Sequence, residues 1–281
     1  MKVVISLILS FIMAYAIMPA KYIDVSDLQG IIEDVEEQPI DSRRWAFIIA
    51  VEEYETADEV IYSESSGEMF ELLANRVLGV SERNTYALID EKATSARIVD
   101  KLDQLVKNVK KGDTIFFYYS GHGVPVPSEN NEPYILPIDK SIGNLSKSKE
   151  LKLSNIYKKL ASSKASKVVA FVDSCFSGAT DKVSVFKGVA APRLVAKNIE
   201  VDRSKMSVVT AGSDKQFSNM YKEKQQRLFS YYLMKGIAEK EYRDLDSLYD
   251  YVRYNVAKTS KGFGQLYKQV PTINGNSDIK F

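Results

Sequence analysis

The chain has only one cysteine and one histidine among 281 residues, and its charges nearly cancel. Lysine and arginine number 38 and aspartate and glutamate 37, so no strong field of either sign favours a nucleic-acid partner. A single cysteine cannot form an internal disulfide. Zinc prefers several cysteine or histidine ligands, and the chain has no glycine-rich phosphate loop. We therefore predict no metal and no cofactor.

The start of the chain has the pattern of a secretory signal peptide over residues 1–20. Lys2 precedes an apolar run, Val3–Met18, and small residues follow it. The run is shorter than the roughly 20 apolar residues that cross a bilayer, and a retained N-terminal anchor is the alternative. We predict an exported protein, periplasmic or secreted, without stable membrane contact beyond this segment. In such a protein the lone Cys175 is either a working thiol or a buried, inert one.

Short apolar runs alternate with segments of helical spacing along the rest of the chain. Buried strands are predicted at 45–51, 85–89, 114–119, 167–172 and 206–211, with a further strand in the tail. Helices are predicted at 67–78, 94–109, 153–160, 228–238 and 245–256. This alternation favours an α/β sheet covered by helices on both faces. Residues 21–44 are interpreted as an acidic leader or propeptide-like segment, partly helical and loosely packed, and 179–205 as a charged connector.

The one histidine and the one cysteine occupy equivalent places in this pattern. His122 lies between Gly121 and Gly123 directly after an apolar strand, and Cys175 follows the end of another. If the two strands are parallel neighbours, both side chains emerge at the same edge of the sheet, as cysteine–histidine catalysis requires. A thiolate would attack a carbonyl carbon, and the imidazole would protonate the leaving amine. The Gly123 and Cys175 amides would hold the oxyanion. Taken separately, a structural histidine and a core cysteine are the commoner alternatives.

Two motifs around these residues carry a family resemblance. Tyr118–Gly123 and Asp173–Gly178 resemble the histidine and cysteine motifs of the caspase-like cysteine peptidases, which include caspases, metacaspases and bacterial relatives. The similarity continues through Tyr134–Asp139, through 210–213 with 228–233, and into Pro271–Ser277. The resemblance therefore covers residues 45–281.

The resemblance implies a fold, a division of the chain and a catalytic pair. The fold is a three-layer sandwich with a six-stranded, mainly parallel sheet and helices on both faces. Residues 45–178 correspond to the large subunit and 206–281 to the small subunit, with the connector between them. His122 and Cys175 would form the catalytic dyad, with oxyanion donors from the Gly123 and Cys175 backbone, and the partners would be protein or peptide substrates.

The aspartate two residues before the cysteine bears on specificity. In metacaspase-like members this position, here Asp173, lies in the pocket for the substrate side chain that precedes the cut. An acidic pocket would select arginine or lysine through a charge-assisted hydrogen bond, and Ser120 would line it. The alternative for Asp173 is an aspartate at a strand end or helix cap.

Two positions depart from the family pattern. A second pocket aspartate is usual where this chain has Ser66, with Glu64 or Glu68 as the nearby substitutes, and a glycine is common where it has Arg227. In the family the connector can be cut by the enzyme itself. Its basic residues, which are the sites predicted for such cleavage, are Lys182, Lys187, Arg193, Lys197, Arg203 and Lys205. A solvated loop with dispersed charges is the alternative interpretation of the connector.

Three functional hypotheses follow. The first is an exported cysteine endopeptidase that cleaves after arginine or lysine and can process its own connector. The second is a catalytically inactive caspase-like binding or scaffold domain, which the missing pocket aspartate at Ser66 motivates. The third is a cysteine amidase that acts on small molecules, and a closed pocket rather than an open groove would favour it.

Overall fold

A computed structural model describes residues 27–175, 179–180, 183–184, 196–197, 199–213, 216–239, 242, 244–277 and 279–280. The predicted signal peptide, the start of the leader and most of the connector, with Lys182, Lys187 and Arg193, lie outside the described residues. Within the part of the chain that the structure describes, no helix is both long and apolar enough to cross a membrane.

The centre of the fold is a six-stranded sheet with the order β12-β9-β6-β3-β1-β2. Its strands are β1 (Arg44–Ala50), β2 (Thr85–Ile89), β3 (Thr114–Ser120), β6 (Lys167–Asp173), β9 (Met206–Thr210) and β12 (Thr272–Gly275). All neighbours pair in parallel except β12, which runs antiparallel to β9. The predicted α/β fold with a mainly parallel sheet is confirmed.

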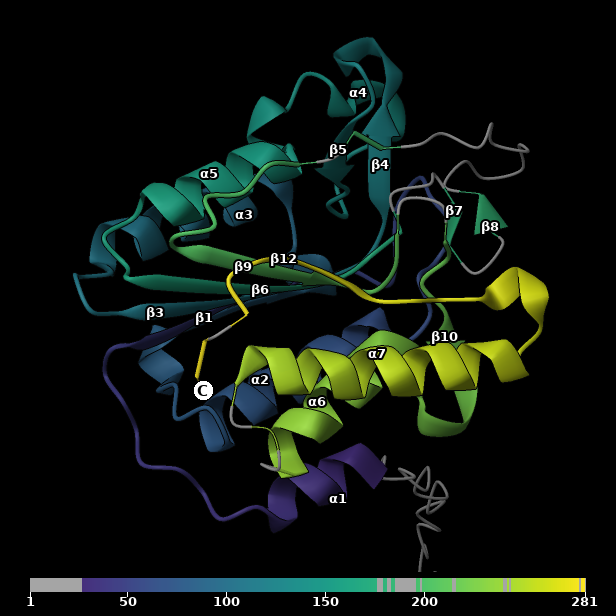
Figure 1. Ribbon diagram of the computed structural model, residues 1–281. Helices are drawn as coiled ribbons and strands as arrows, with labels where there is room; N and C mark the ends of the chain where they lie inside the picture. Colours follow the sequence, from purple (N-terminus) through teal and green to yellow (C-terminus); the bar gives the residue numbers. More distant parts are fainter. Residues whose placement is uncertain are drawn as a thin grey trace, which may run out of the picture.

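Helices cover both faces of this sheet (Figure 1). One face carries α3 (Ser95–Asn108) and α5 (Leu153–Ser162), and the other carries α2 (Ser63–Arg76), α6 (Leu228–Glu239) and α7 (Leu245–Gly262), with α1 (Asp27–Asp34) outside them. The smaller elements are α4 (Ile142–Leu145) and three hairpins: β4 (Gly123–Val126) with β5 (Glu132–Ile135), β7 (Ala179–Thr180) with β8 (Val183–Ser184), and β10 (Met220–Tyr221) with β11 (Gln226–Arg227).

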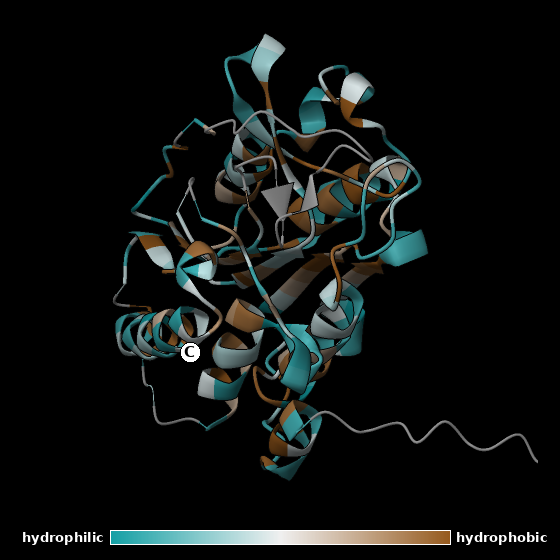
Figure 2. Cartoon of the chain, turned by 90° about the vertical axis from the view of Figure 1, so that its right-hand side faces the viewer, coloured by the Kyte–Doolittle hydropathy of each residue, from teal (hydrophilic) through white to brown (hydrophobic). Residues whose placement is uncertain are grey.

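The alternation of side chains along each strand divides the core into two layers. On β3, Phe117 and Tyr119 belong to the cluster under α3 and α5, whereas Phe116 and Tyr118 belong to the cluster that α2 and α6 cover. Figure 2 shows hydrophobic residues in the strands and on the inner sides of the helices. Because both faces are buried, the strands read as continuous apolar runs, which is why the sequence identifies them.

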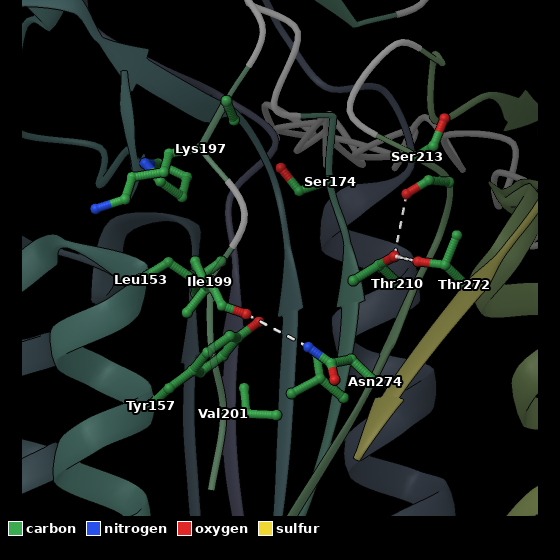
Figure 3. A pocket seen from close by; sticks show the side chains of 14 residues that line it. Leu153, Tyr157, Ser174, Lys197, Ile199, Val201, Thr210, Ser213, Thr272 and Asn274 are labelled. Carbon is green, nitrogen blue, oxygen red and sulfur yellow. Dashed lines mark hydrogen bonds between the residues drawn. The ribbon is translucent and has the colours of Figure 1, made fainter. Parts of the chain in front are cut away.

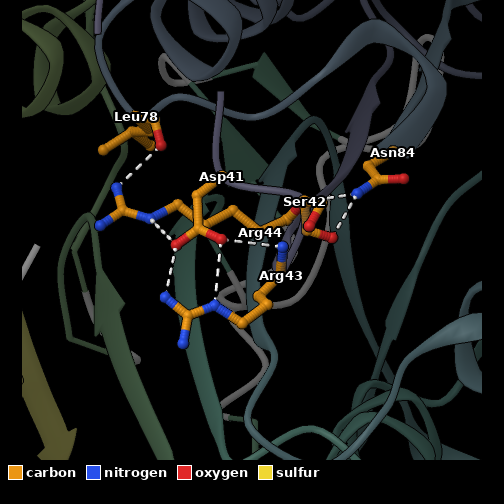
Figure 4. Close-up of polar contacts among 6 residues, drawn as sticks. All are labelled: Asp41, Ser42, Arg43, Arg44, Leu78 and Asn84. Atoms are coloured by element: carbon orange, nitrogen blue, oxygen red, sulfur yellow. Dashed lines mark hydrogen bonds and ion pairs between the residues drawn. The ribbon is translucent and has the colours of Figure 1, made fainter. Parts of the chain in front are cut away.

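The entry to β1 is fixed by a polar network (Figure 4). Asp41 accepts hydrogen bonds from the backbone and the guanidinium of Arg43, and Arg44 donates to the Leu78 carbonyl oxygen at 2.8 Å. The Asn84 amide donates to the carbonyl oxygens of Ser42 and Arg44 at 3.1 Å each. These contacts join the start of β1 to the segments that follow α2.

Two expectations about the elements need correction. Helix α2 begins at Ser63, four residues before the predicted start, because the polar serines of its first turn interrupt the apolar spacing while facing the protein interior. The leader does not pack loosely over its described part: Leu28 and Ile32 of α1 are fully buried against α2 and α6. These two residues lie four apart and share one helix face, which the many acidic residues around them obscure in the sequence.

Candidate active site

The register between β3 and β6 brings the histidine and the cysteine to the same edge of the sheet. Ser120 of β3 is paired with Asp173 of β6, and His122 and Cys175 each lie two residues beyond this pair. Both are buried, with exposed fractions of 0% for His122 and 2% for Cys175. The strands that precede His122 and Cys175 are therefore parallel neighbours, as cysteine–histidine catalysis requires.

The imidazole of His122 is oriented by a backbone carbonyl group. Its Nε2 lies 2.7 Å from the carbonyl oxygen of Asp58, in the loop between β1 and α2. A carbonyl oxygen can only accept a hydrogen bond, so Nε2 carries the proton in the neutral ring and Nδ1 carries the lone pair. A fixed tautomer of this kind leaves Nδ1 as the nitrogen that can take and return a proton.

Two tyrosines hold the backbone around His122. Its N–H donates to the Tyr54 hydroxyl at 2.8 Å, and its carbonyl oxygen accepts from the Tyr119 hydroxyl at 2.5 Å. The Tyr54 ring also packs on the imidazole, with 4.8 Å between the ring centroids. Burial raises the pKa of Tyr54 and of Tyr119, so both hydroxyls keep their protons at neutral pH.

Gly121 allows this arrangement because it leaves room for both hydroxyls. Its φ of 149° lies in a region that residues with a side chain rarely adopt. A Cβ atom at this position would lie 2.7 Å from the Tyr54 hydroxyl oxygen and 3.1 Å from that of Tyr119. Only glycine therefore fits between β3 and His122 without moving the tyrosines.

The thiol of Cys175 lies against the loop between β9 and β10. It is not in a disulfide, and the Ser218 backbone N–H donates to its Sγ. An N–H donor stabilises negative charge on sulfur, which is the charge of the reactive thiolate. Gly123, the other predicted oxyanion donor, is the first residue of β4, where it is paired with Ile135.

Asp173 lies on the α2 and α6 face, next to the cysteine, and is only 1% exposed. Its Oδ1 accepts from the Ser218 hydroxyl, and its Oδ2 accepts from the Ser230 backbone N–H at 3.1 Å and from the Ser230 hydroxyl at 2.6 Å. Burial raises the pKa of Asp173, while the positive charge of Arg227 and the serine hydrogen bonds act against this rise.

Asp173 is the centre of a buried polar group, which we call the Asp173 cluster. Its members are Ser63, Ser66, Ser120, Asp173, Ser218, Arg227 and Ser230, and all are at least 98% buried. The Ser120 hydroxyl lies 2.8 Å from that of Ser63, and the Ser66 hydroxyl accepts from the Arg227 backbone N–H at 2.9 Å. The predicted pocket residues Asp173 and Ser120 are thus brought together, while Glu64 and Glu68 lie on the exposed side of α2.

The opposite face of the same sheet edge is less polar. Ser174 alternates with Asp173 and Cys175, so its side chain points to the α5 side, into a pocket of about 260 Å³ (Figure 3). Tyr157 of α5, Ile199 and Asn274 of β12 line this pocket. The buried Ser174 hydroxyl has no hydrogen-bond partner among the described residues. The cluster and this pocket therefore lie on different sides of the strand that carries the cysteine.

Sequence reasoning missed Tyr54, Asp58, Ser218 and Ser230. Asp58 acts through its backbone carbonyl, so its side chain carries no signal. Serines are common in this chain, and only the fold shows that Ser218 and Ser230 face Asp173. Tyr54 is one of 17 tyrosines, and nothing in its position in the sequence links it to His122.

Comparison with known proteins identifies the family of the chain. Residues 43–280 match the family model of the caspase domain. The chain belongs to this peptidase family. The resemblance that the two motifs suggested is confirmed, and the domain is a caspase- and metacaspase-like cysteine peptidase domain.

Individual relatives match over shorter stretches. A probable protease from a Desulfuromonadales bacterium is 29% identical over 151 residues, covering 47% of this chain and 18% of that protein. Metacaspase-6 of Arabidopsis thaliana is 42% identical over 59 residues, covering 19% of this chain and 16% of that protein. The chain thus spans less than a fifth of the length of these two curated relatives.

Solved structures share the fold at low sequence identity. A structural-genomics protein of Geobacter sulfurreducens superposes with a TM-score of 0.57 at 18% identity, covering 84% of this chain and 94% of that one. Caspase-1 of Spodoptera frugiperda gives a TM-score of 0.53 at 14% identity, covering 85% of this chain and 89% of its own. These likenesses support the caspase-like sheet order and its layers of helices.

Proposed function

We propose that this protein is an exported cysteine endopeptidase in which Cys175 is the nucleophile and His122 the acid and base. The observation that carries the proposal is the shared sheet edge: the chain's only histidine and only cysteine each lie two residues beyond the paired ends of β3 and β6. The bond from His122 Nε2 to the Asp58 carbonyl adds the orienting group that a catalytic imidazole needs.

The proposed reaction follows from this arrangement. The Cys175 thiol gives its proton to Nδ1 of His122, and the thiolate attacks the carbonyl carbon of the peptide bond. The backbone amides of Gly123 and Cys175 hold the oxyanion, and the imidazolium returns the proton to the leaving amine as the C–N bond breaks. Water, deprotonated by His122, then attacks the thioester and releases the acid and the thiol.

Three finer parts of the proposal rest on the sequence. Export depends on the apolar segment Val3–Met18. Self-cleavage depends on the connector, of whose basic residues Lys197 pairs with Glu132 at 2.7 Å and Lys205 donates to the Ser163 carbonyl oxygen. Cleavage after arginine or lysine depends on the carboxylate of Asp173 being open to a substrate cation, and it stays a prediction.

The test is to map cleavage without assuming a substrate. The mature chain and its Cys175→Ala and His122→Ala variants are incubated with a complex peptide mixture, and new termini are identified by mass spectrometry. The proposal predicts new termini with the wild-type chain, none with Cys175→Ala, and a loss of at least about 100-fold in His122→Ala because general acid–base catalysis contributes that much or more. Ser162→Ala, on the exposed end of α5, is the matched control.

The same experiment also tests a second function, that of an inactive binding or scaffold domain. The Asp173 cluster is closed and internally bonded, which is what an inactive binding or scaffold domain would also show. Absence of new termini from the wild-type chain, with Cys175 unreactive toward peptidyl electrophiles, would overturn the peptidase proposal and support that alternative. Hydrolysis of small amides without peptide cleavage would instead indicate an amidase.

A further inference from the structure

Arg227 is a fully buried arginine at the junction of β11 and α6. Its exposed fraction is 0%, and it is the largest fully buried side chain in the described part of the molecule. One guanidinium nitrogen donates to the Ile61 carbonyl oxygen at 3.0 Å, and another donates to the carbonyl oxygen and to the hydroxyl of Ser218. The guanidinium is therefore fixed inside the Asp173 cluster rather than directed to solvent.

A buried guanidinium requires a compensating negative charge, since an isolated buried ion is strongly unfavourable. Asp173 is the nearly inaccessible carboxylate of the same cluster. Ser218 joins the two groups, because its hydroxyl donates to Asp173 Oδ1 and accepts from Arg227. Burial raises the pKa of both Asp173 and Glu52, and the positive charge of Arg227 opposes this rise in each, so the guanidinium acts on the carboxylates around it.

The guanidinium also lies close to the reactive thiol. Ser218 donates its backbone N–H to Cys175 Sγ while its side chain bonds Asp173 and Arg227. One serine therefore separates the guanidinium from the nucleophile. A substrate arginine that reached Asp173 from Cys175 would have to displace the Ser218 hydroxyl, which Arg227 holds in place.

The two departures from the family pattern meet at this point. The Arg227 backbone N–H donates to the Ser66 hydroxyl at 2.9 Å. Ser66, which replaces the usual aspartate, therefore contacts Arg227, which replaces the common glycine. Asp173 and Arg227 are the charged members of the cluster, so Asp173 does not face a substrate ion as an uncompensated charge. A second cation would compete with Arg227, and a substrate carboxylate would meet Asp173.

We propose that Arg227 is the resident counter-charge of Asp173, linked to it through Ser218, and the specificity-determining residue of the site, so that the wild-type chain cleaves after uncharged residues and not after arginine or lysine. This inference rests on the proposed peptidase function. In the wild-type chain it replaces the basic preference that Asp173 alone predicts, and with it the expected self-cleavage after the basic residues of the connector. The preference for arginine or lysine would then be seen only after the Arg227 side chain is removed.

The first test compares peptides that differ only in the residue before the cut, which is arginine, lysine, glutamine or aspartate. The readout is the ratio of kcat/KM for the arginine peptide to that for the glutamine peptide. We expect a ratio below one for the wild-type chain and a rise of at least about tenfold in Arg227→Gly, the size of one charge-assisted hydrogen bond. Asp173→Asn in the Arg227→Gly background should abolish the rise, and Arg227→Lys should keep the wild-type ratio.

A binding measurement separates this inference from the peptidase proposal. In the Cys175→Ala background, calorimetry with agmatine, a soluble alkyl guanidine, should show binding to Arg227→Gly and none to the chain that retains Arg227. Arg227→Ala is the second variant, and agmatine should raise its midpoint of thermal unfolding. This result can be obtained even if no peptide is cleaved.

The inference would be overturned by any of three results. These are a wild-type preference for arginine over glutamine, an unchanged ratio in an active Arg227→Gly variant, or no agmatine effect on either substituted chain. Cleavage that fails in every chain while agmatine binds Arg227→Gly would remove the peptidase proposal but leave Arg227 as the counter-charge of Asp173.

Discussion

At Gly121 the backbone leaves β3 and turns into the histidine loop. The conformation has a φ of 149°, and the space where a side chain would begin is taken by the hydroxyls of Tyr54 and Tyr119. Both hydroxyls bond the backbone of His122, one from each side of the residue. The orientation of the imidazole therefore depends on a residue that has no side chain.

Gly121→Ala should destabilise the fold and disturb the site together. We expect the free energy of unfolding to fall by about 1–3 kcal/mol, because alanine is strained at this φ and its Cβ meets the Tyr54 hydroxyl. Urea denaturation measures this change. Gly143→Ala is the matched control, since nothing lies within 4 Å of its Cβ position. Equal stabilities for the two variants would show that the histidine loop does not need glycine.

The sequence identifies residues whose chemistry is rare and misses those whose role depends on position. His122 and Cys175 are single occurrences of their type, so each attracts attention before any fold is known. Ser218 contacts Cys175, Asp173 and Arg227, yet it is one serine among many and lies 43 residues from the cysteine. Arg227 is visible as a departure from the family pattern, but only the structure shows that it donates to Ser218, which itself donates to Asp173.

At the scale of elements, the strands are predictable because burial on both faces makes them uniformly apolar. The predicted strand at 85–89 matches β2 at both ends, β1 is offset by one residue at both ends, and β3, β6 and β9 differ by one residue at their C-terminal ends. Helix α1 is the element whose packing the sequence predicts wrongly. Its acidic surface suggests a loose leader, but Asp27 accepts from Tyr231 at 3.0 Å and pairs with Lys224, which ties the helix to the C-terminal part of the chain.

Leu28→Ala tests whether α1 belongs to the folded domain. Leu28 is fully buried against α6 and α2, so we expect a loss of about 2–5 kcal/mol in the free energy of unfolding, as for other large-to-small core substitutions. Thermal or urea unfolding provides the measurement. Asp34→Ala, exposed at the end of the same helix, should change stability by no more than about 0.5 kcal/mol. A stable Leu28→Ala variant would restore the interpretation of a loosely packed leader.

At the scale of the whole molecule, the sheet order joins segments that are distant in the sequence. The histidine and cysteine strands are neighbours at the centre of the sheet, and the C-terminal part supplies Ser218, Arg227 and Ser230 to the same edge. The two motifs predict this meeting only through their family resemblance, because strand order is not encoded in apolar spacing. Residues on both sides of the connector thus contribute to the same edge of the sheet.

The central claim is that Cys175 attacks with the help of His122, and covalent labelling tests it most directly. A peptidyl acyloxymethyl ketone with glutamine in the position before the reactive group is added to the mature chain, and intact mass follows adduct formation over time. The account predicts one adduct on Cys175 of the wild-type chain, none on Cys175→Ala, and labelling of His122→Ala slowed by at least about 100-fold. Labelling of His122→Ala at the wild-type rate, or a wild-type chain that forms no adduct, would contradict it.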